Sequence, residues 1–270
     1  MKLLALVTDA FGAVGGIAQY NRDLLTGLSG ESGNRVVVVP RHGTANPSEL
    51  PVGVKQLTSA RKYPFVLAAL RAAVIEGPFD AVFCGHIHLA PLTASIAALL
   101  GRPLWLQLHG TEAWGPLSRL QLLAAERAIL VTAVSRYTRR RFLQLTRIDP
   151  FRVRVLPNTI GAGFSPGPKP DYLLDRHKLH GRPVLLTVGR LIAAERGKGH
   201  DRMLQVLPEL LKTHPKLVYL VVGDGDDRKR FEKLAMQAGF GGVVLYAGLV
   251  PSEELGDYYR LADVFGMPST

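Results

Sequence analysis

The stretch VLLTVGRL, residues 184–191, decides the fold. The apolar and β-branched run Pro183–Val188 predicts a buried strand, and the glycine after it predicts a tight turn. ERGKGH follows at residues 195–200, and the pattern over His200–Lys212 predicts an amphipathic helix. A strand, a glycine-containing loop and a helix in this order begin a βαβ unit with a parallel sheet.

The same alternation extends in both directions along the chain. Beyond this stretch, the expected elements are strands Leu217–Val222 and Val243–Ala247, helices Asp226–Ala238 and Pro251–Arg260, and a strand starting in Ala262–Met267. Before it, the expected strands are Leu3–Thr8, Arg35–Pro40, Ala81–Cys84, Pro103–Leu108, Ala128–Ala133 and Val153–Leu156, and the expected helices include Gly16–Leu28, Pro64–Glu76, Leu89–Leu100 and Ser135–Leu145. We therefore predict an α/β protein with two Rossmann-like domains.

A segment rich in proline and glycine separates the two series of strands. Residues 157–170 contain four prolines and three glycines, which is typical of an interdomain linker. We expect an N-terminal domain over residues 1–160, a linker over 161–181 and a C-terminal domain over 182–270. The second series contains fewer strands than the first, so we expect the C-terminal domain to be incomplete.

Positive charge is concentrated in the first part of the chain. Residues 1–170 hold 19 lysines and arginines against nine acidic residues, whereas residues 171–270 hold 14 against 13. This excess indicates an anionic partner, such as a lipid surface or a phosphate-linked acceptor, or equally a solvated surface that maintains solubility. Aromatic residues make up only 7% of the chain and are not interleaved with the arginines, which disfavours a nucleic-acid module.

Neither a membrane span nor a disulfide is expected. The N-terminal apolar run is short and ends at Asp9, which fits a first strand better than a signal peptide. Cys84, the single cysteine, follows an apolar run, and we interpret it as a buried thiol. These features are compatible with a reducing cytoplasm.

Two motifs in the first half stand where parallel sheets bind ligands. Phe11–Ile17 follows the first strand and contains Gly15 and Gly16, whose backbone could approach a phosphate at the next helix N-terminus. Its spacing differs from the G-x-G-x-x-G fingerprint, which disfavours a nicotinamide enzyme; a plain βα turn is the alternative. His109 ends another strand, with Glu112 nearby to orient it. It could donate a hydrogen bond or shuttle a proton, or be purely structural.

Other residues are weaker candidates. His86 and His88 end the preceding strand, and the lack of a carboxylate or cysteine set with ligand spacing argues against a metal site. Gly223 and Gly225 form a glycine turn after a strand of the second half. Such a turn is common in α/β proteins and carries little weight alone.

Arg190 and Lys198 are the sharpest candidates of the second half. They place two cations near a helix N-terminus, where charge and helix dipole together favour a diphosphate. Arg190 is the stronger of the two, because it stands at a strand end rather than within the loop. The alternative is a solvated basic loop.

Taken in order, these motifs resemble the family 4 retaining glycosyltransferases of the GT-B fold (glycosyltransferase group 1). The series runs from Gly15-Gly16 through His109-Gly110, Ser135 and Pro157-Asn158 to Gly189-Arg190-Leu191 with Lys198-Gly199-His200, Gly223-Asp224-Gly225 and residues 248–269. It covers nearly the whole chain. The resemblance implies that the N-terminal domain holds the acceptor and the C-terminal domain holds a UDP-sugar or GDP-sugar.

The resemblance also implies roles for individual residues. Arg190 and Lys198 would bind the donor diphosphate and stabilise its charge as it departs, without a metal or other cofactor. The backbone of Gly15 and Gly16 would approach the donor phosphates or the acceptor, and His109 would contact the transferred sugar. Gly223 and Gly225 would lie at the donor site.

Two departures from the family pattern bear on these roles. The spacing from Arg190 to Lys198 is longer than is usual, so Arg196 could share the role of Lys198. The family's acidic E-x(7)-E pair follows the motif that here is Pro268-Ser269, and the given sequence stops at Thr270. We therefore expect a truncated C-terminal domain with an exposed apolar edge near Val264-Phe265, prone to aggregate or oligomerise.

The sequence thus predicts sugar transfer with retention onto an acceptor hydroxyl in polysaccharide or glycolipid assembly. We expect a cytoplasmic protein with peripheral contact on the inner membrane face. Residues 116–128 and the helix with Arg136, Arg139, Arg140 and Arg141 are the candidate contact, or merely solvated. A GT-B sugar-nucleotide 2-epimerase and a truncated, binding-only protein remain alternatives.

Overall fold

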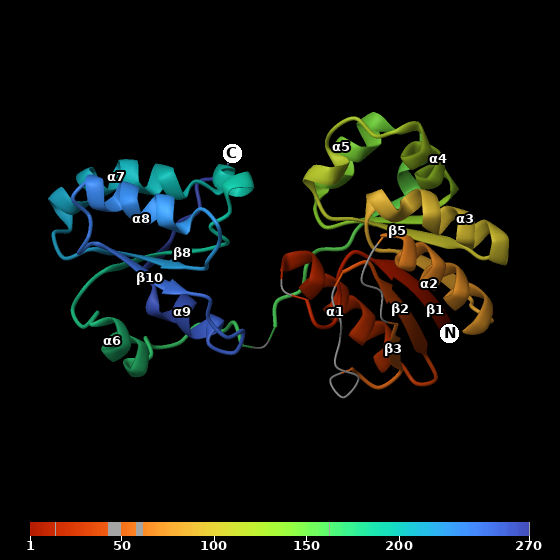
Figure 1. Cartoon of the computed structure of the whole chain (residues 1–270), viewed down its shortest axis with the longest axis horizontal. Coiled ribbons are helices and arrows are strands. Elements are labelled where there is room, and N and C mark those ends of the chain that lie inside the picture. Colours follow the sequence, from red (N-terminus) through yellow and green to blue (C-terminus); the bar gives the residue numbers. More distant parts are fainter. Residues whose placement is uncertain (14, 43–49, 58–61, 162, 270) are drawn as a thin grey trace. The chain divides into compact units, whose positions relative to one another are not determined.

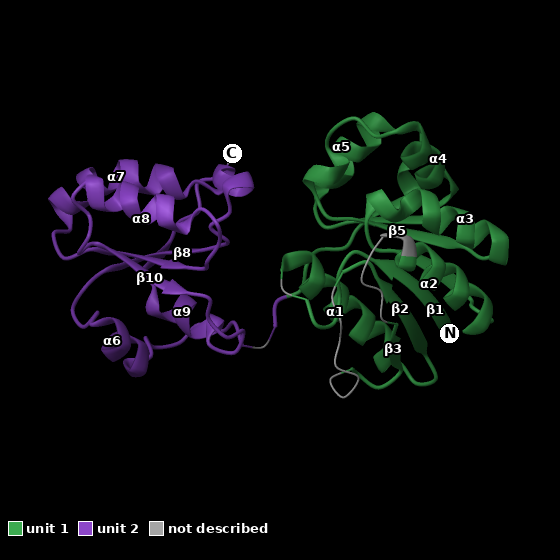
Figure 2. Cartoon of the chain, in the orientation of Figure 1, with its two compact units in different colours: residues 1–159 green, residues 160–270 purple. Residues whose placement is uncertain are grey.

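The computed structural model describes the chain except for residues 14, 43–49, 58–61, 162 and 270. The described chain forms two compact units, Met1–Thr159 and Ile160–Thr270, coloured separately in Figure 2. Each unit contains one parallel β-sheet with helices on both faces (Figure 1). This arrangement confirms the predicted α/β fold of two Rossmann-like parts.

The sheet of the first unit has the strand order β3-β2-β1-β4-β5-β6-β7. Its strands are β1 (Lys2–Val7), β2 (Arg35–Pro40), β3 (Val54–Gln56), β4 (Ala81–Cys84), β5 (Leu104–Leu108), β6 (Leu130–Ala133) and β7 (Val153–Val155). Every neighbouring pair is parallel. The central strands are buried on both faces, because helices cover the two sides, and they therefore read as continuous apolar runs.

In the described part of this unit, five α-helices cover the sheet. They are α1 (Gly16–Gly30), α2 (Lys62–Ile75), α3 (Ala90–Leu100), α4 (Arg119–Arg127) and α5 (Arg136–Leu145). Leu25 of α1 packs with Leu3 and Val38 on one face. The other four helices pack on the opposite face, where Phe142 of α5 is fully buried. The alternating strand residues supply both faces of the core.

The second unit repeats the plan with the strand order β10-β9-β8-β11. Its strands are β8 (Val184–Val188), β9 (Val218–Val222), β10 (Val244–Gly248) and β11 (Val264–Phe265), all paired in parallel. In both units the strand order reverses beside the first strand, between β1 and β4 and between β8 and β11. Loops at the carboxyl ends of strands diverge at such a reversal and leave room for a ligand.

Four α-helices cover the second sheet among its described residues. Figure 1 shows α7 (His200–Thr213) and α8 (Arg228–Gln237) on one face, and α6 (Asp171–His177) and α9 (Leu255–Leu261) on the other. Residues 161–181, expected to form a linker, include α6. Leu173 of this helix and Leu179 just after it are fully buried with Tyr258 of α9, so they belong to the core of this unit.

The structure tests two local predictions, the burial of the Cys84 thiol and the exposure of an apolar sheet edge near Val264-Phe265. Cys84 is fully buried, and burial raises the pKa of its thiol to about 11, which confirms the predicted inert core thiol. β11 forms one edge of the second sheet, and its Val264 and Phe265 are 60% and 46% exposed. None of the helices in the described part of the chain has the length and apolar character that a membrane span requires.

Candidate active site

The residues singled out in the first unit gather at the reversal point of its sheet. The loop with Gly15 and Gly16 follows β1, Gly85 follows β4, and His109 follows β5. Adjacent parallel strands place their carboxyl ends at one edge, so these loops share one side of the sheet. Gly85 is required there, because a Cβ at this position would lie 2.7 Å from Cγ1 of Val7.

The glycine loop leaves an open backbone at the start of α1. Gly15 has a φ of 133°, which disfavours any other residue, and a Cβ at Gly15 or Gly16 would meet nothing within 4 Å. No side chain caps α1. The Arg22 guanidinium donates to the carbonyls of Ala10 (3.0 Å) and Ala13 (2.5 Å), which holds the loop in place. Val14 lies outside the described residues.

A contact with a backbone carbonyl determines which ring nitrogen of His109 carries the hydrogen. Its Nε2 lies 2.9 Å from the carbonyl oxygen of Gly85, and a carbonyl only accepts, so Nε2 carries the hydrogen. Burial lowers the pKa of His109 below its usual value. The ring is therefore neutral near pH 7, and its Nδ1 is a hydrogen-bond acceptor. In the described structure no protein group donates to Nδ1.

Glu112 orients this segment through the backbone rather than through the ring. Its Oε1 accepts from the amides of His109 (2.6 Å) and Gly110 (3.0 Å). Glu112 therefore positions His109 through its backbone amide, and within the described part of the chain its carboxylate makes no hydrogen bond to the imidazole. Tyr20 of α1 instead supports the ring, in an edge contact with ring centroids 5.1 Å apart.

A buried polar chain lies behind His109. Tyr20 Oη donates to Gln107 Oε1 at 2.9 Å, and Thr132 donates to the same oxygen. Trp105 Nε1 donates to Thr132 Oγ1 at 2.7 Å, so the chain crosses from β5 to β6. Each member is satisfied, which makes this a rigid support for the strand end that carries His109.

The two weaker histidines are explained by local structure. His86 is 8% exposed, its Nδ1 accepts from the His88 amide at 3.2 Å, and burial lowers its pKa to about 4. His88 Nδ1 lies 2.9 Å from Nε2 of Gln121 on α4. Within the described residues, no group of three or more histidine, cysteine or acidic side chains is arranged to hold a metal ion.

The candidate cations of the second unit converge on one carboxylate. Arg190 Nη2 pairs with Glu195 Oε1, and Lys198 Nζ lies 2.6 Å from Glu195 Oε2. The sequence assigns no role to Glu195, because only the folded loop brings both cations to it. Burial would raise the pKa of Glu195, but Lys198 and Arg190 outweigh burial and lower it. In the loop after β8, the carboxylate of Glu195 thus lies between the two cations.

Arg196 belongs to a different cluster. Its Nε and Nη2 donate to the two oxygens of Asp227 at 2.9 and 2.5 Å. Arg230 donates to the same carboxylate at 2.6 Å and to Asp201 at 2.9 Å. Arg196 and Arg230 hold the pKa of the Asp227 carboxyl well below its usual range. The suggestion that Arg196 shares the role of Lys198 is therefore not supported by its contacts.

Gly223 and Gly225 serve the packing of two loops. A Cβ at Gly223 would lie 2.0 Å from the carbonyl oxygen of Gly189, and one at Gly225 would lie 2.1 Å from that of Leu191. The amide of Gly189 donates to the Val222 carbonyl at 2.9 Å, which joins the same loops. These glycines hold the backbone of the Arg190 loop, and their contacts do not by themselves indicate ligand binding.

His200 lies beside the same loop. It is 5% exposed, and neither of its ring nitrogens has a hydrogen-bond partner among the described residues. A cavity of about 10 Å³ is lined by His200, Glu195, Arg196, Arg230 and their neighbours. That volume is close to the minimum for one water molecule.

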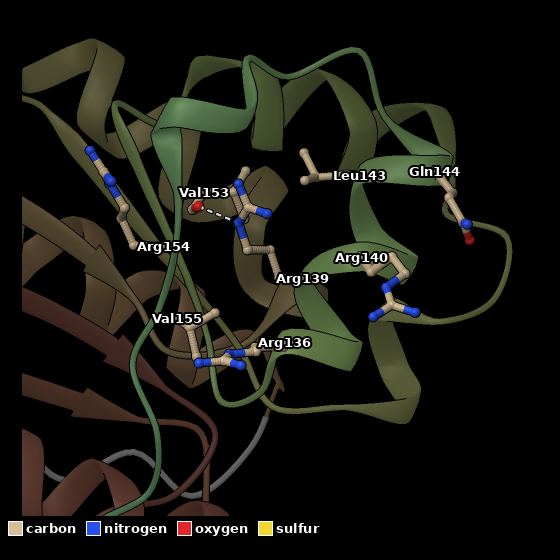
Figure 3. A pocket seen from close by; sticks show the side chains of 8 residues that line it. All are labelled: Arg136, Arg139, Arg140, Leu143, Gln144, Val153, Arg154 and Val155. Carbon is tan, nitrogen blue, oxygen red and sulfur yellow. Dashed lines mark hydrogen bonds between the residues drawn. The ribbon is translucent and has the colours of Figure 1, made fainter.

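A larger depression of about 660 Å³ lies between α5 and β7 of the first unit. It is lined by Arg136, Arg139, Arg140, Leu143, Gln144 and Val153–Val155. Figure 3 shows Arg139 directed at the Val153 carbonyl, to which its Nε donates at 2.8 Å, while Arg136 and Arg140 project from α5. Arg141 donates to the carbonyl of Trp114 at 3.1 Å, and Trp114 Nε1 donates to Thr138 of α5 at 3.1 Å.

Two protein-family models match the chain, one over most of the first unit and one over most of the second. The model described as Glycosyltransferase Family 4 matches residues 14–162, more than half of the chain. The chain belongs to this family of glycosyltransferases. The model described as Glycosyl transferases group 1 matches residues 174–270. Membership of family 4 places the chain among the transferases, as the ordered motifs predicted.

Named glycosyltransferases from other organisms are similar to the chain. The GDP-mannose-dependent alpha-(1-6)-phosphatidylinositol monomannoside mannosyltransferase of Mycolicibacterium smegmatis is 29% identical over 211 residues, covering 76% of this chain and 54% of the relative. The GDP-mannose-dependent monoacylated alpha-(1-6)-phosphatidylinositol monomannoside mannosyltransferase of Corynebacterium glutamicum is 25% identical over 287 residues, covering 99% of this chain and 72% of the relative. The chain spans about half the length of the first of these relatives.

Solved structures of the GT-B type share the fold of the chain. Anabaena HepE in complex with UDP-glucose aligns with a TM-score of 0.76 at 19% identity, covering all of this chain and 74% of that one. A sucrose-phosphate synthase from Thermosynechococcus elongatus aligns with a TM-score of 0.71 at 18% identity, covering 100% and 76%. At these identities the alignments show the two-domain α/β fold alone.

Proposed function

We propose that the protein transfers a sugar from a nucleotide-diphosphate sugar to an acceptor hydroxyl, with retention of the anomeric configuration. The observation that carries the proposal is the convergence of Arg190 and Lys198 on one anionic group after β8. In the proposed reaction the bond from the anomeric carbon to the diphosphate breaks. A bond to the acceptor oxygen forms, and the acceptor proton is released. Two fixed cations stabilise the charge of the departing diphosphate.

The donor is proposed to be a UDP-sugar or a GDP-sugar bound by the second unit. The mycobacterial relative is named for GDP-mannose and the Anabaena structure contains UDP-glucose, which supports a donor of this class. The loop after β8 brings two cations together at the carboxyl end of that strand, where parallel sheets bind ligands. Gly223 and Gly225 contribute by holding the backbone of the Arg190 loop.

His109 is proposed to contact the transferred sugar. Because Nε2 donates to Gly85, the ring offers Nδ1 as an acceptor for a sugar hydroxyl. A neutral imidazole suits this task, since burial lowers its pKa. The open backbone at Gly15 and Gly16 is proposed to approach the donor phosphates or the acceptor, because neither position carries a side chain that blocks access.

Measuring nucleotide release tests this function against its alternatives. The chain is incubated with UDP-sugars and GDP-sugars, and free nucleotide diphosphate and any isomerised donor are quantified. We expect release that is lost in Arg190→Gln and kept in Lys229→Gln, an exposed control on α8. An isomerised donor without release would favour the 2-epimerase, which family membership does not support, and binding without turnover would favour a binding-only protein.

The acceptor is proposed to be a sugar or a lipid-linked sugar at an anionic membrane surface. Arg136 and Arg140 project from α5, and the described residues that line the depression beside them include no acidic side chain. The two relatives named above act on phosphatidylinositol mannosides, which supports a glycolipid. Arginines on a helix are attracted to anionic headgroups.

Vesicle sedimentation tests the membrane proposal. We expect binding to vesicles containing phosphatidylinositol and weaker binding of the Arg136→Gln/Arg140→Gln double variant. Arg71→Gln/Arg102→Gln, which removes two exposed arginines elsewhere in the first unit, should bind as the unaltered chain does. Equal loss in both double variants would show that net charge, and not this depression, governs binding.

A further inference from the structure

Glu195 occupies the position between the two cations proposed to bind the donor diphosphate. Its two oxygens face different partners, Oε1 toward Arg190 and Oε2 toward Lys198 at 2.6 Å. The side chain is 27% exposed and lies within the short helical stretch Ala193–Lys198 that joins β8 to α7. One carboxylate therefore neutralises about half of the positive charge that the loop offers to an anion.

The carboxylate and a diphosphate cannot both be held closely by these cations. A phosphate between Arg190 and Lys198 would place its negative oxygens beside those of Glu195. Like charges at contact distance repel strongly in a partly desolvated site. Binding of a diphosphate thus requires the Glu195 side chain to move away from at least one cation.

We infer that Glu195 is an internal counter-ion that fills the diphosphate position in the empty protein and sets the affinity for the donor. This inference rests on the proposed function, because it assigns a partner to the same two cations. Donor binding exchanges one anion for another, and release of the nucleotide diphosphate lets the carboxylate return. Glu195 consequently keeps the two cations facing each other between binding events.

The exposure of the ion pairs makes such an exchange feasible. The Arg190 and Lys198 side chains are 58% and 31% exposed and that of Glu195 is 27% exposed. Solvent therefore weakens the pair with Arg190 most, whereas Oε2 of Glu195, which faces Lys198, is buried. A diphosphate carries more charge than a carboxylate and can accept several hydrogen bonds from one guanidinium. Arg196 does not compete for Glu195, because Asp227 engages its guanidinium through both oxygens.

The direction of the effect distinguishes a counter-ion from a positioning residue. A glutamate that only orients Arg190 and Lys198 would strengthen donor binding, so its removal would weaken binding. A counter-ion competes with the donor, so its removal strengthens binding. The variant Glu195→Gln removes the charge and keeps the size of the side chain.

Calorimetric titration with UDP, GDP and inorganic pyrophosphate makes the test. We expect Glu195→Gln to bind a nucleotide diphosphate roughly tenfold more tightly than the unaltered chain. Pyrophosphate binding should tighten in parallel, because the effect does not involve the base. Glu209→Gln is the matched control, since Glu209 pairs with Lys212 at 2.8 Å on the exposed face of α7. Glu195→Asp, which keeps the charge, should remain near the unaltered affinity.

The titrations distinguish failure of the counter-ion role of Glu195 from failure of the proposed donor site. Equal or weaker binding by Glu195→Gln overturns the counter-ion role while leaving the donor site intact. If neither protein binds UDP, GDP or pyrophosphate, the proposed function fails and the inference fails with it. Arg190→Gln in the Glu195→Gln background should abolish the gain, and a gain that survives this change would place the anion elsewhere.

Discussion

At the scale of single residues, two arginines six positions apart have different tasks. Among the residues that the structure describes, the Arg190 side chain pairs with Glu195 alone and is 58% exposed, whereas Arg196 binds an Asp227 carboxylate that is 7% exposed. Removing the partner of a buried charge leaves that charge incompletely satisfied, which costs stability. Removing an exposed cation costs little stability but deprives a ligand of its contact.

This contrast gives the first prediction. Arg190→Gln should weaken nucleotide diphosphate binding by about tenfold or more, with a thermal midpoint near that of the unaltered chain. Arg196→Gln should lower the thermal midpoint below that of Arg190→Gln, because Asp227 loses one of its two arginine partners, and should leave affinity within about threefold. Calorimetry and thermal unfolding on the same preparations check both. The assignment fails if Arg196→Gln loses affinity while its stability is unchanged.

A second prediction concerns His86, whose pKa burial lowers to about 4. Above the unfolded-state pKa of about 6.5, both folded and unfolded states carry a neutral imidazole. As the pH falls from about 6.5 toward 4, only the unfolded state takes the proton, so the folded state loses stability. The loss approaches about 3 kcal/mol for this one group.

Urea unfolding as a function of pH tests this effect. His86→Asn keeps an acceptor for the His88 amide but does not titrate, so its stability should fall less between pH 6.5 and 4. The unaltered chain supplies the comparison, and its other titrating groups cancel in the difference. Parallel curves for the two proteins would show that His86 does not carry the linkage.

At the scale of elements, two loops of the second unit touch backbone to backbone. The turn after β9 packs on the loop after β8, and Gly223 has a φ of 133° at the contact. Gly223→Ala should destabilise this unit by at least about 2 kcal/mol through strain and a clash with the Gly189 carbonyl. Gly242→Ala, where a Cβ meets nothing within 4 Å, should be nearly neutral. Chemical denaturation compares the two, and equal midpoints would refute the packing role.

The sequence predicts the long, fully buried elements well. Arg35–Pro40 and Ala81–Cys84 are strands with the expected bounds, because continuous apolar runs between turns are typical of a parallel sheet. β3 escapes prediction, since it has three residues and none is fully buried. α6 also escapes, because it follows a segment dense in proline and glycine, yet Leu173 anchors it to a core that only folding creates.

The sequence also predicts the positions of candidate site residues better than it predicts the contacts that these residues make after folding. Strand ends locate His109 and Arg190, since ligands of parallel sheets bind there. Spacing alone does not separate Lys198 from Arg196, because the path of residues 193–198 decides which cation reaches Glu195 and which reaches Asp227. The tautomer of His109 likewise depends on Gly85, which is 24 residues away in the sequence.

At the scale of the whole molecule, one sheet edge favours self-association. β11 pairs with β8 on one side, and its Val264 and Phe265 are exposed. Strand edges with apolar side chains tend to pair with other chains. We predict an apparent mass that rises with concentration in light scattering, and a smaller rise for Val264→Lys. Val206→Lys, at a 46% exposed position of α7, is the control. A concentration-independent monomer would refute this prediction.

The positions of the two tryptophans have a practical consequence for all these measurements. Trp105 and Trp114, the two tryptophans of the chain, both lie in the first unit and are held there by Thr132 and Thr138. Their fluorescence therefore reports the folding of that unit alone, while far-ultraviolet dichroism reports both. Unfolding that is seen by dichroism before the tryptophan emission shifts belongs to the second unit, so the two signals together can distinguish the unfolding of the two units.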